Sequence, residues 1–247
     1  MAYRSIMGVF VVLVIAKASG TINEINIQQL RLHLTRNITH FVGQNLWFFA
    51  LNAITLAQLF AFEFSVPVWV ALFAPFFLSE KLTLKRFMAA SIGFIGILIV
   101  ARPDEIGLTP GILAAALCAI CFTGTGIATK LLTRKQSITC ILFWLTMMQT
   151  IFGVICAGYD FQITVPSKST LPWVVVIGFA GLTAHFCITR ALQLADAMVV
   201  YPMDFVRLPI ATAIGVLFFD EPIQIFVFIG AITVSYTHLT LPTTPYV

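Results

Sequence analysis

Apolar runs about as long as a lipid bilayer is thick recur along nearly the whole chain. A helix that crosses a bilayer needs ~20 mostly apolar residues. The 247-residue chain is 60% hydrophobic and only 10% charged, whereas a soluble domain carries roughly 25% charged residues. We therefore predict an all-α polytopic integral membrane protein with nine spans along this sequence.

One of these runs, residues 199–221, carries Asp204 and Arg207 well inside it. Ionisable groups at that depth cost at least ~2.5 kcal/mol each, so they usually face a protein interior or a water-filled path. Pro202 and Pro209 bracket the pair, and each proline leaves the carbonyl four residues earlier without its helical partner. The run predicts a broken, charged membrane helix, which is typical of transporters.

A second run repeats this pattern earlier in the chain. Glu63 precedes Glu80 by 17 residues (80 − 63), and Asp204 precedes Glu221 by 17 residues (221 − 204). Pro67 follows Glu63, so this helix is also expected to break. The two copies lie about 140 residues apart, and a fixed period of this kind indicates an internal repeat.

The distribution of Lys and Arg orients the spans. With residues 17–36 placed inside and the chain alternating at each span, ten basic residues fall inside and three outside, as the positive-inside rule requires. The loop after the first carboxylate run is then inside, and the loop after the second is outside. Inverted repeats with interrupted helices are the architecture of many secondary transporters, with the site between the halves near mid-membrane.

The stretch 101–110 is rich in turn residues, and we place the boundary between the repeats there. The first repeat covers residues 1–103 and the second covers 104–234. Residues 235–247 resemble the product of an adapter sequence read in frame, so we expect a foreign or artefactual tail. We expect a polar connector at 17–36, a turn at 56–60, and spans at residues 6–16, 37–55, 61–79, 87–100, 111–129, 138–158, 172–189, 198–219 and from 223.

At this point the residues resemble the EamA-like family of drug/metabolite transporters. The matching elements are EFSVPVWVALFAPFFLSEKLT and GFIGILIVARP in the first half, and YPMDFVRLPIATAIGVLFFDEP in the second. The resemblance implies a ten-helix protein of two five-helix units, the export or exchange of small metabolites, and a bacterial inner (plasma) membrane location. By that comparison we expect the first helix to be missing and the tenth to be cut short.

The charged residues of the two broken runs are the main candidates for the transport pathway. Arg207 is expected to attract an anionic or zwitterionic substrate, and Asp204 to set its orientation. The alternative is a buried ion pair that only fixes the helix, because residues at i and i+3 can pair on one face. Glu63 is expected to take up a proton, or else to lie solvated near the outer membrane surface.

Several other polar and aromatic residues fall within the spans. Asn45 and Asn52 share a helix face because they are seven residues apart. Each of these residues has two interpretations, the pathway or ordinary helix packing. The candidates besides the three charged residues are Gln44, Asn45, Asn52, Trp69, Tyr201 and His185, with Trp47 as a further aromatic in a span.

The sequence does not favour other classes of protein. Cys118 and Cys121 have a C-x-x-C spacing without a second pair, so no metal site or cofactor is expected. There is no phosphate-binding G-x4-G-K-[ST] motif, and an enzyme is not expected. We predict a secondary transporter working by alternating access, with proton coupling as an option; the alternative is a non-transporting scaffold or an inactive fragment. The expected partners are a small metabolite, membrane lipid and, as an option, a second copy in a homodimer, but no nucleic acid.

Overall fold

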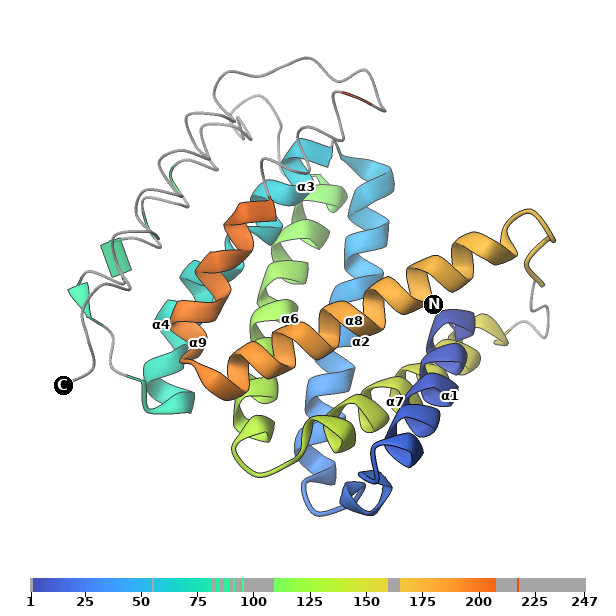
Figure 1. Cartoon of the computed structure of the whole chain (residues 1–247). Helices are drawn as coiled ribbons and strands as arrows, with labels where there is room; N and C mark the ends of the chain where they lie inside the picture. Colours follow the sequence, from blue (N-terminus) through green and yellow to red (C-terminus); the bar gives the residue numbers. More distant parts are fainter. Residues whose placement is uncertain are drawn as a thin grey trace. The chain divides into compact units, whose positions relative to one another are not determined.

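The computed structural model describes residues 2–54, 56–80, 83–84, 87–88, 91, 95, 109–159, 165–207 and 217. Across these ranges the chain forms α-helices and short 3₁₀ helices, with no β-strand (Figure 1). The prediction of an all-α fold is confirmed. Several sequence predictions fall wholly or mostly outside the described residues. They are the spans 87–100 and from 223, the helix break at Pro209, and the tail 235–247.

Three helices are long and apolar enough to cross a membrane in the part of the chain that the structure describes, namely α6, α7 and α8. Each of their ends lies within five residues of the corresponding end of a predicted span. The α-helices are α1 (Ala2–Ala18), α2 (Leu30–Ala53), α3 (Leu56–Glu63), α4 (Val66–Leu78), α6 (Pro110–Thr133), α7 (Ile138–Ala157), α8 (Leu171–Leu194) and α9 (Ala197–Val200), and the 3₁₀ helices are η1 (Ile22–Glu24) and η3 (Tyr201–Val206).

Corresponding helices in the two predicted repeats are separated by about the same number of residues as the two copies of the sequence pattern. Helices α2 and α8 each have 24 residues, and both their ends differ by 141 positions (171 − 30 and 194 − 53). Helices α3 and α9 also begin 141 positions apart (197 − 56). Glu63 and Asp204 have this separation too (204 − 63). These separations equal the period of the sequence pattern. The boundary at residues 103 and 104 lies outside the described residues, and the division into two repeats stays a prediction.

The chain forms two compact units. The first consists of Met1–Phe41 and Ala128–Ala195, and the second of Val42–Ile127 and Asp196–Val247. Each unit therefore takes segments from both predicted repeats, and helices α2 and α6 contribute residues to both units.

In the first unit, α1 packs against α7 and α8, and polar side chains join further helices. Val12 is buried with Leu142 and Leu145. Arg36 donates from Nε to Thr129 Oγ1 at 3.1 Å, and Gln149 donates from Nε2 to the Asn37 carbonyl oxygen at 2.9 Å. Buried polar groups need such partners because an unmade hydrogen bond is costly away from water.

These contacts correct the expected connector at residues 17–36. Helix α2 already begins at Leu30, and His33, Arg36 and Asn37 are buried. The charge of Arg36 suggested a solvated loop, but its hydrogen bond to α6 allows the residue to lie inside the bundle. The connector is therefore limited to the residues between Ala18 and Leu30.

Lys130 holds the C-terminal end of α8 within the first unit. Its ammonium donates to the carbonyl oxygens of Leu192 at 2.8 Å and Ala195 at 2.7 Å, at the negative end of the helix dipole. Lys130→Met is expected to destabilise the protein by about 2–3 kcal/mol, since both carbonyls lose a charged donor. Thermal unfolding of the purified protein measures this loss. Lys135→Met, at an exposed position, is the matched control, and an equal effect of the two changes would contradict this role.

In the second unit, small side chains let helices α2, α3 and α6 approach closely. Ala50, Leu59, Ala114 and Ala115 form a buried cluster. A Cβ atom added to Gly111 would lie 2.8 Å from the Ala53 side chain, so a larger residue there would push α6 away from α2. Small residues at such contacts are the usual way for membrane helices to pack closely.

The predicted turn at residues 56–60 is wrong, because those residues belong to α3. The sequence Leu56–Phe60 contains neither glycine nor proline and is helical. The break instead falls at Phe64 and Ser65, and Pro67 lies in the first turn of α4. A proline at that place cannot donate to a carbonyl of the preceding turn, and the Ser65 hydroxyl donates to the Phe62 carbonyl oxygen at 2.6 Å.

The expected span 198–219 begins as two short helices of different type. The α-helical segment α9 ends at Val200, and the 3₁₀ helix η3 begins at Tyr201 with Pro202 as its second residue. Since proline removes a backbone donor within a helix, the change of helix type falls where the sequence places Pro202.

Candidate functional site

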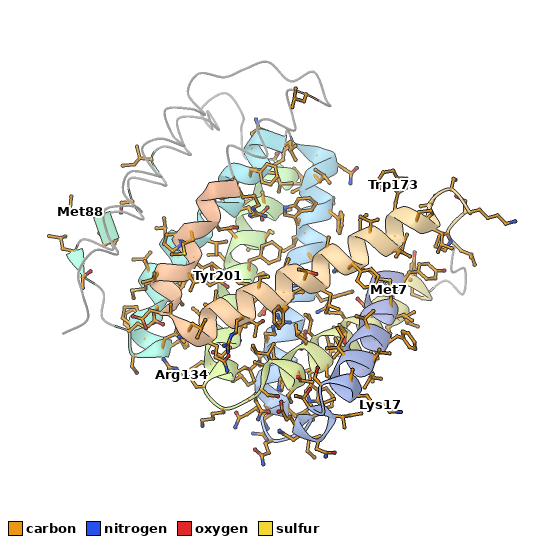
Figure 2. All side chains as sticks on the ribbon, viewed as in Figure 1. Met7, Lys17, Met88, Arg134, Trp173 and Tyr201 are labelled. Atoms are coloured by element: carbon orange, nitrogen blue, oxygen red, sulfur yellow. The ribbon has the colours of Figure 1, made fainter. Side chains whose placement is uncertain are left out.

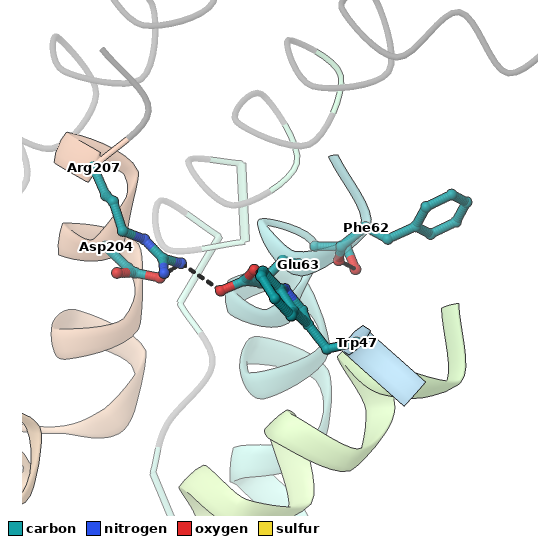
Figure 3. A network of polar contacts seen from close by, with 6 residues as sticks. Trp47, Phe62, Glu63, Asp204 and Arg207 are labelled. Carbon is teal, nitrogen blue, oxygen red and sulfur yellow. Dashed lines mark hydrogen bonds and ion pairs between the residues drawn. The ribbon is translucent and has the colours of Figure 1, made fainter. Parts of the chain in front are cut away.

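Four side chains from three segments form one polar network in the second unit (Figure 3). Arg207 Nη2 donates to Glu63 Oε1 at 2.7 Å and to Asp204 Oδ2 at 2.8 Å. The indole Nε1 of Trp47 donates to the other oxygen of Glu63, Oε2, at 2.8 Å. Glu63 at the end of α3 is thus held by a residue of α2 and by a residue next to η3, which lies 144 positions away in sequence.

The network is buried at one end and open at the other. The Glu63 side chain is 12% exposed, whereas those of Arg207 and Asp204 are 43% and 48% exposed. This burial argues against the interpretation of Glu63 as a solvated surface residue. Arg207 offers its Nη2 to both carboxylates, so its Nη1 and Nε donors have no partner among the residues that the structure describes. A free guanidinium edge beside an accessible carboxylate can bind a polar ligand.

Aromatic rings hold the guanidinium in place. The Arg207 Cζ atom lies 5.3 Å from the centre of the Phe64 ring and 5.9 Å from that of Phe60. These distances suit cation–π attraction. Phe62, in contrast, points away from the network in Figure 3. Phe60 and Phe64 are four residues apart in sequence and flank Glu63, so this short segment supplies both the carboxylate and the rings.

The type of helix explains why Asp204 and Arg207 meet. A 3₁₀ helix has three residues per turn, so side chains at i and i+3 are aligned along one line. Asp204 lies within η3 and Arg207 follows directly after it. The 3₁₀ segment that contains Pro202 therefore aligns the acid with the base.

Glu80 fixes the start of the segment that carries Asp204 and Arg207. It is only 7% exposed, and its oxygens accept hydrogen bonds from the backbone nitrogens of Ala197 at 3.0 Å and Met198 at 3.2 Å. The first backbone N–H groups of a helix have no partner within the helix. A residue of the first predicted repeat thus caps α9, in the second. Sequence reasoning singled out Glu80 only as a repeat marker.

Tyr201 lies directly against α6 in the second unit. A Cβ atom added to Gly126 would overlap the hydroxyl oxygen and the ring of Tyr201. Tyr201, labelled in Figure 2, begins η3 three residues before Asp204. The missing side chain at position 126 therefore makes room for a residue next to the network.

Gly126→Val is expected to displace Tyr201 and to destabilise the protein by about 1–3 kcal/mol, the usual cost of overpacking. Thermal unfolding measures the effect. Tyr201→Ala in the same chain opens the space again, so the double variant should unfold at a higher temperature than Gly126→Val alone. Equal stability of the single and double variants would contradict the close contact.

The remaining candidates of the second unit lie on α2 and α4. Trp69 Nε1 donates to the Ser65 hydroxyl at 3.1 Å, and its ring stacks on Phe73 at 6.3 Å. Asn52 donates to the Phe48 carbonyl oxygen of its own helix at 2.8 Å. Asn45 and Asn52 are exposed and Gln44 is half-buried. None of these side chains has a contact with the charged network that the structure records among the described residues.

Two residues differ in importance from what the sequence suggested. His185 belongs to the first unit, where its ring meets His40 edge-on with centroids 4.9 Å apart. Trp47, which the sequence favoured as a packing residue, bonds Glu63 directly. An indole N–H inside a membrane segment needs an acceptor, and this requirement could have marked Trp47 as part of a polar site. The sequence could not identify the acceptor, because Glu63 lies on another helix.

Comparison with known proteins places this chain in a family. The sequence pattern of the EamA-like transporter family matches residues 1–102 and 109–236. The chain belongs to the EamA-like transporter family. Members of this family are transporters rather than enzymes, and the resemblance seen in the sequence is confirmed.

Named relatives of this EamA-like chain are bacterial transporters. It is 27% identical to an S-adenosylmethionine uptake transporter of Rickettsia conorii over 77% of this chain and 64% of that protein. It is 30% identical to a riboflavin transporter of Rhizobium johnstonii over 81% of this chain and 66% of that protein. A riboflavin transporter of Vibrio cholerae is 28% identical over 86% of this chain and 72% of that protein. The chain thus spans about two thirds of the length of these relatives.

The fold of this EamA-like chain is also found in a solved structure. A crystal structure aligns with 96% of this chain and 84% of the other, with a TM-score of 0.78 and 18% sequence identity. At that identity the likeness shows the fold alone. Together with the family and the long apolar helices, it confirms the prediction of a polytopic membrane protein.

Proposed function

We propose that this chain is a secondary transporter of small metabolites that works by alternating access, with Glu63, Asp204 and Arg207 in the substrate pathway. The observation that carries the proposal is the network in which Arg207 bridges Glu63 and Asp204. Ionisable groups inside membrane proteins usually mark substrate or ion paths. This network also joins the acidic residues of the two predicted repeats. Inverted-repeat transporters have their binding sites at the interface between the repeats.

The Nη1 and Nε donors of Arg207 have no partner among the described residues, and the Asp204 carboxylate is exposed. Together they suit a polar, zwitterionic or anionic group of the substrate. Arg207 donors pair well with carboxylates or with two neighbouring carbonyl oxygens. Asp204 accepts from an ammonium or hydroxyl group. Because Phe60 and Phe64 restrain the guanidinium, the site keeps its donors oriented before the substrate arrives.

Riboflavin and S-adenosylmethionine, named for the relatives, are the first compounds to test. Both join a flat nitrogen heterocycle to a hydroxylated five-carbon unit. The indole of Trp47 at the network supports a ring-bearing substrate, since aromatic faces stack on flat heterocycles.

The bacterial relatives support a location in the inner membrane. Val176, Ile177 and Phe179 of α8 are at least half exposed, and we propose that lipid covers this helix. The homodimer expected from the sequence stays a prediction.

Transport by the purified full-length protein tests the proposal. The protein would be reconstituted into liposomes that contain a pH-sensitive dye. Riboflavin, S-adenosylmethionine and a panel of amino acids and sugars would then be added as candidate substrates. Glu63→Gln and Asp204→Asn should each lower transport at least tenfold while leaving the protein folded. Glu24→Gln, an exposed acid, is the matched control.

The dye separates the driving forces. Proton movement evoked by a substrate and lost in Glu63→Gln supports a proton-coupled carrier, whereas transport without proton movement supports exchange. A well-folded full-length protein that transports none of these compounds would contradict the proposal. It would favour the alternative that the protein is a non-transporting membrane scaffold.

A further inference from the structure

One guanidinium serves two carboxylates in the network of Glu63, Asp204 and Arg207 (Figure 3). Arg207 Nη2 lies 2.7 Å from Glu63 Oε1 and 2.8 Å from Asp204 Oδ2. Among the described residues, the structure records no further ion pair to any of these three side chains. Two ionised acids and one arginine leave the network with one negative charge that no described residue balances.

The two carboxylates differ in the donors that hold them. Glu63 accepts from Arg207 at Oε1 and from the indole of Trp47 at Oε2. Asp204 accepts from Arg207 at Oδ2, and no hydrogen bond to its Oδ1 is recorded within the described ranges. Glu63 is largely buried, whereas about half of the Asp204 side chain is exposed. A molecule that enters the site therefore meets Asp204 Oδ1 as the acceptor that is still available.

The energy of the extra negative charge depends on how far solvent reaches the site. Attraction between opposite charges grows as the effective dielectric constant falls, as it does away from bulk water. A charge in such surroundings is stable only when a partner of opposite sign balances it. Because Asp204 is about half exposed, solvent screens part of the attraction. We expect a positive group at Asp204 to bind about tenfold more tightly than an uncharged group of the same size.

Arg207 supplies the other half of the site. Its Nη1 and Nε donors have no partner among the described residues, so an acceptor atom of a substrate can bind there. The rings of Phe64 and Phe60 lie 5.3 Å and 5.9 Å from the Arg207 Cζ atom and restrain it. The site thus presents a donor edge beside an acceptor. A compound that is only anionic can use the donor edge, but it adds a second unbalanced negative charge.

We propose that the transported metabolite has a cationic centre, such as an ammonium group, that binds Asp204 Oδ1. A hydrogen-bond acceptor of the same molecule binds the Nη1 and Nε edge of Arg207. This inference rests on the proposed function and narrows its substrate class. Cations, and zwitterions with an accessible cationic centre, are carried, whereas compounds that are only anionic are not. The summed charge of the network makes this selection.

Thermal unfolding of the purified full-length protein with three matched probes tests the selection. The probes are propylammonium, propionamide and propionate, which each have three carbons and differ in charge, at one ionic strength set with sodium chloride. A ligand that binds the folded state raises the unfolding temperature in a concentration-dependent way. Propylammonium should bind about tenfold more tightly than propionamide, and propionate should bind more weakly than either.

Two variants separate the charge of the network from the contact with Asp204. Glu63→Gln removes the extra negative charge but keeps Asp204, so the preference for propylammonium over propionamide should fall to about threefold or less. Asp204→Asn removes both the charge and the acceptor and should abolish the propylammonium effect. Glu24→Gln, an exposed acid of the first unit, is the matched control and should keep the preference of the wild type.

Several results would overturn the inference. They are a wild type that is not stabilised by propylammonium, one that is stabilised equally by propylammonium and propionate, and a preference that is unchanged in Glu63→Gln. A network whose extra charge is already balanced by a proton would give the second of these results. If Asp204→Asn does not fold, the wild type and Glu63→Gln decide.

Inhibition of transport distinguishes failure of this inference from failure of the proposed function. Propylammonium should inhibit the transport of any carried compound more strongly than propionate does, at equal concentration in the liposome assay. If a compound is carried and the two probes inhibit equally, the transporter stands and the cationic substrate class is wrong. If nothing is carried although propylammonium selectively stabilises the folded protein, the proposed function fails.

Discussion

Arg207→Gln is expected to lower transport at least a hundredfold and to destabilise the protein. The change removes the one positive charge that bridges Glu63 and Asp204, so two carboxylates are left side by side. Breaking a buried pair costs about 3–5 kcal/mol, but Arg207 is 43% exposed and solvent screens part of this. We therefore expect a loss of about 1–3 kcal/mol, measured by thermal unfolding, beside the transport assay in liposomes.

The double variant Glu63→Gln, Arg207→Gln separates stability from transport. It removes the uncompensated charge of Glu63, so the unfolding temperature should recover while transport stays low. Arg190→Gln, which removes an exposed arginine bonded to Gln193, is the matched control. If Arg207→Gln transported and unfolded like Arg190→Gln, the network would have neither a functional nor a structural role.

Glu80→Ala is expected to have the largest effect on stability. Glu80 is buried and accepts from the backbone nitrogens of Ala197 and Met198. Alanine leaves both N–H groups without an acceptor at the start of α9, which should cost roughly 2–5 kcal/mol. Because α9 leads directly into η3, transport should fall with it. Thermal unfolding and transport of the same preparation measure both effects.

Glu80→Gln tests whether both carboxylate oxygens of Glu80 are needed to cap α9. Its single amide oxygen still accepts from one N–H group, so it should lose roughly half as much stability as alanine does. Glu24→Ala, at an exposed acid, should unfold like the wild type. A Glu80→Ala protein as stable as Glu24→Ala would show that α9 is not held by this carboxylate.

Local patterns were enough to predict most of the described helices and to single out the charged residues of the candidate network. The apolar runs gave the all-α membrane fold, and the prolines placed the breaks near Glu63 and Tyr201. Asp204 and Arg207 are three positions apart, so their contact followed from helix geometry. The repeated spacing of acids also anticipated the offset of 141 positions between α2 and α8.

Contacts between distant segments were beyond the reach of one sequence. The bond from Arg207 to Glu63 spans 144 positions, and the cap from Glu80 to Ala197 spans 117. Neither has a local signature, because each depends on which helices pack together. For the same reason His33 and Arg36 suggested a solvated connector, although contacts with other helices bury them.

The fluorescence emission of Trp47 tests most directly whether a transported compound reaches the network of Glu63, Asp204 and Arg207. In a full-length protein whose Trp69, Trp144 and Trp173 are replaced by phenylalanine, Trp47 reports on the residue that holds Glu63. We predict a saturable change in its emission when a transported compound is added, and no such change in Glu63→Gln or in a protein that keeps only Trp173. Saturable transport with unchanged Trp47 emission would contradict the placement of Glu63, Asp204 and Arg207 in the pathway.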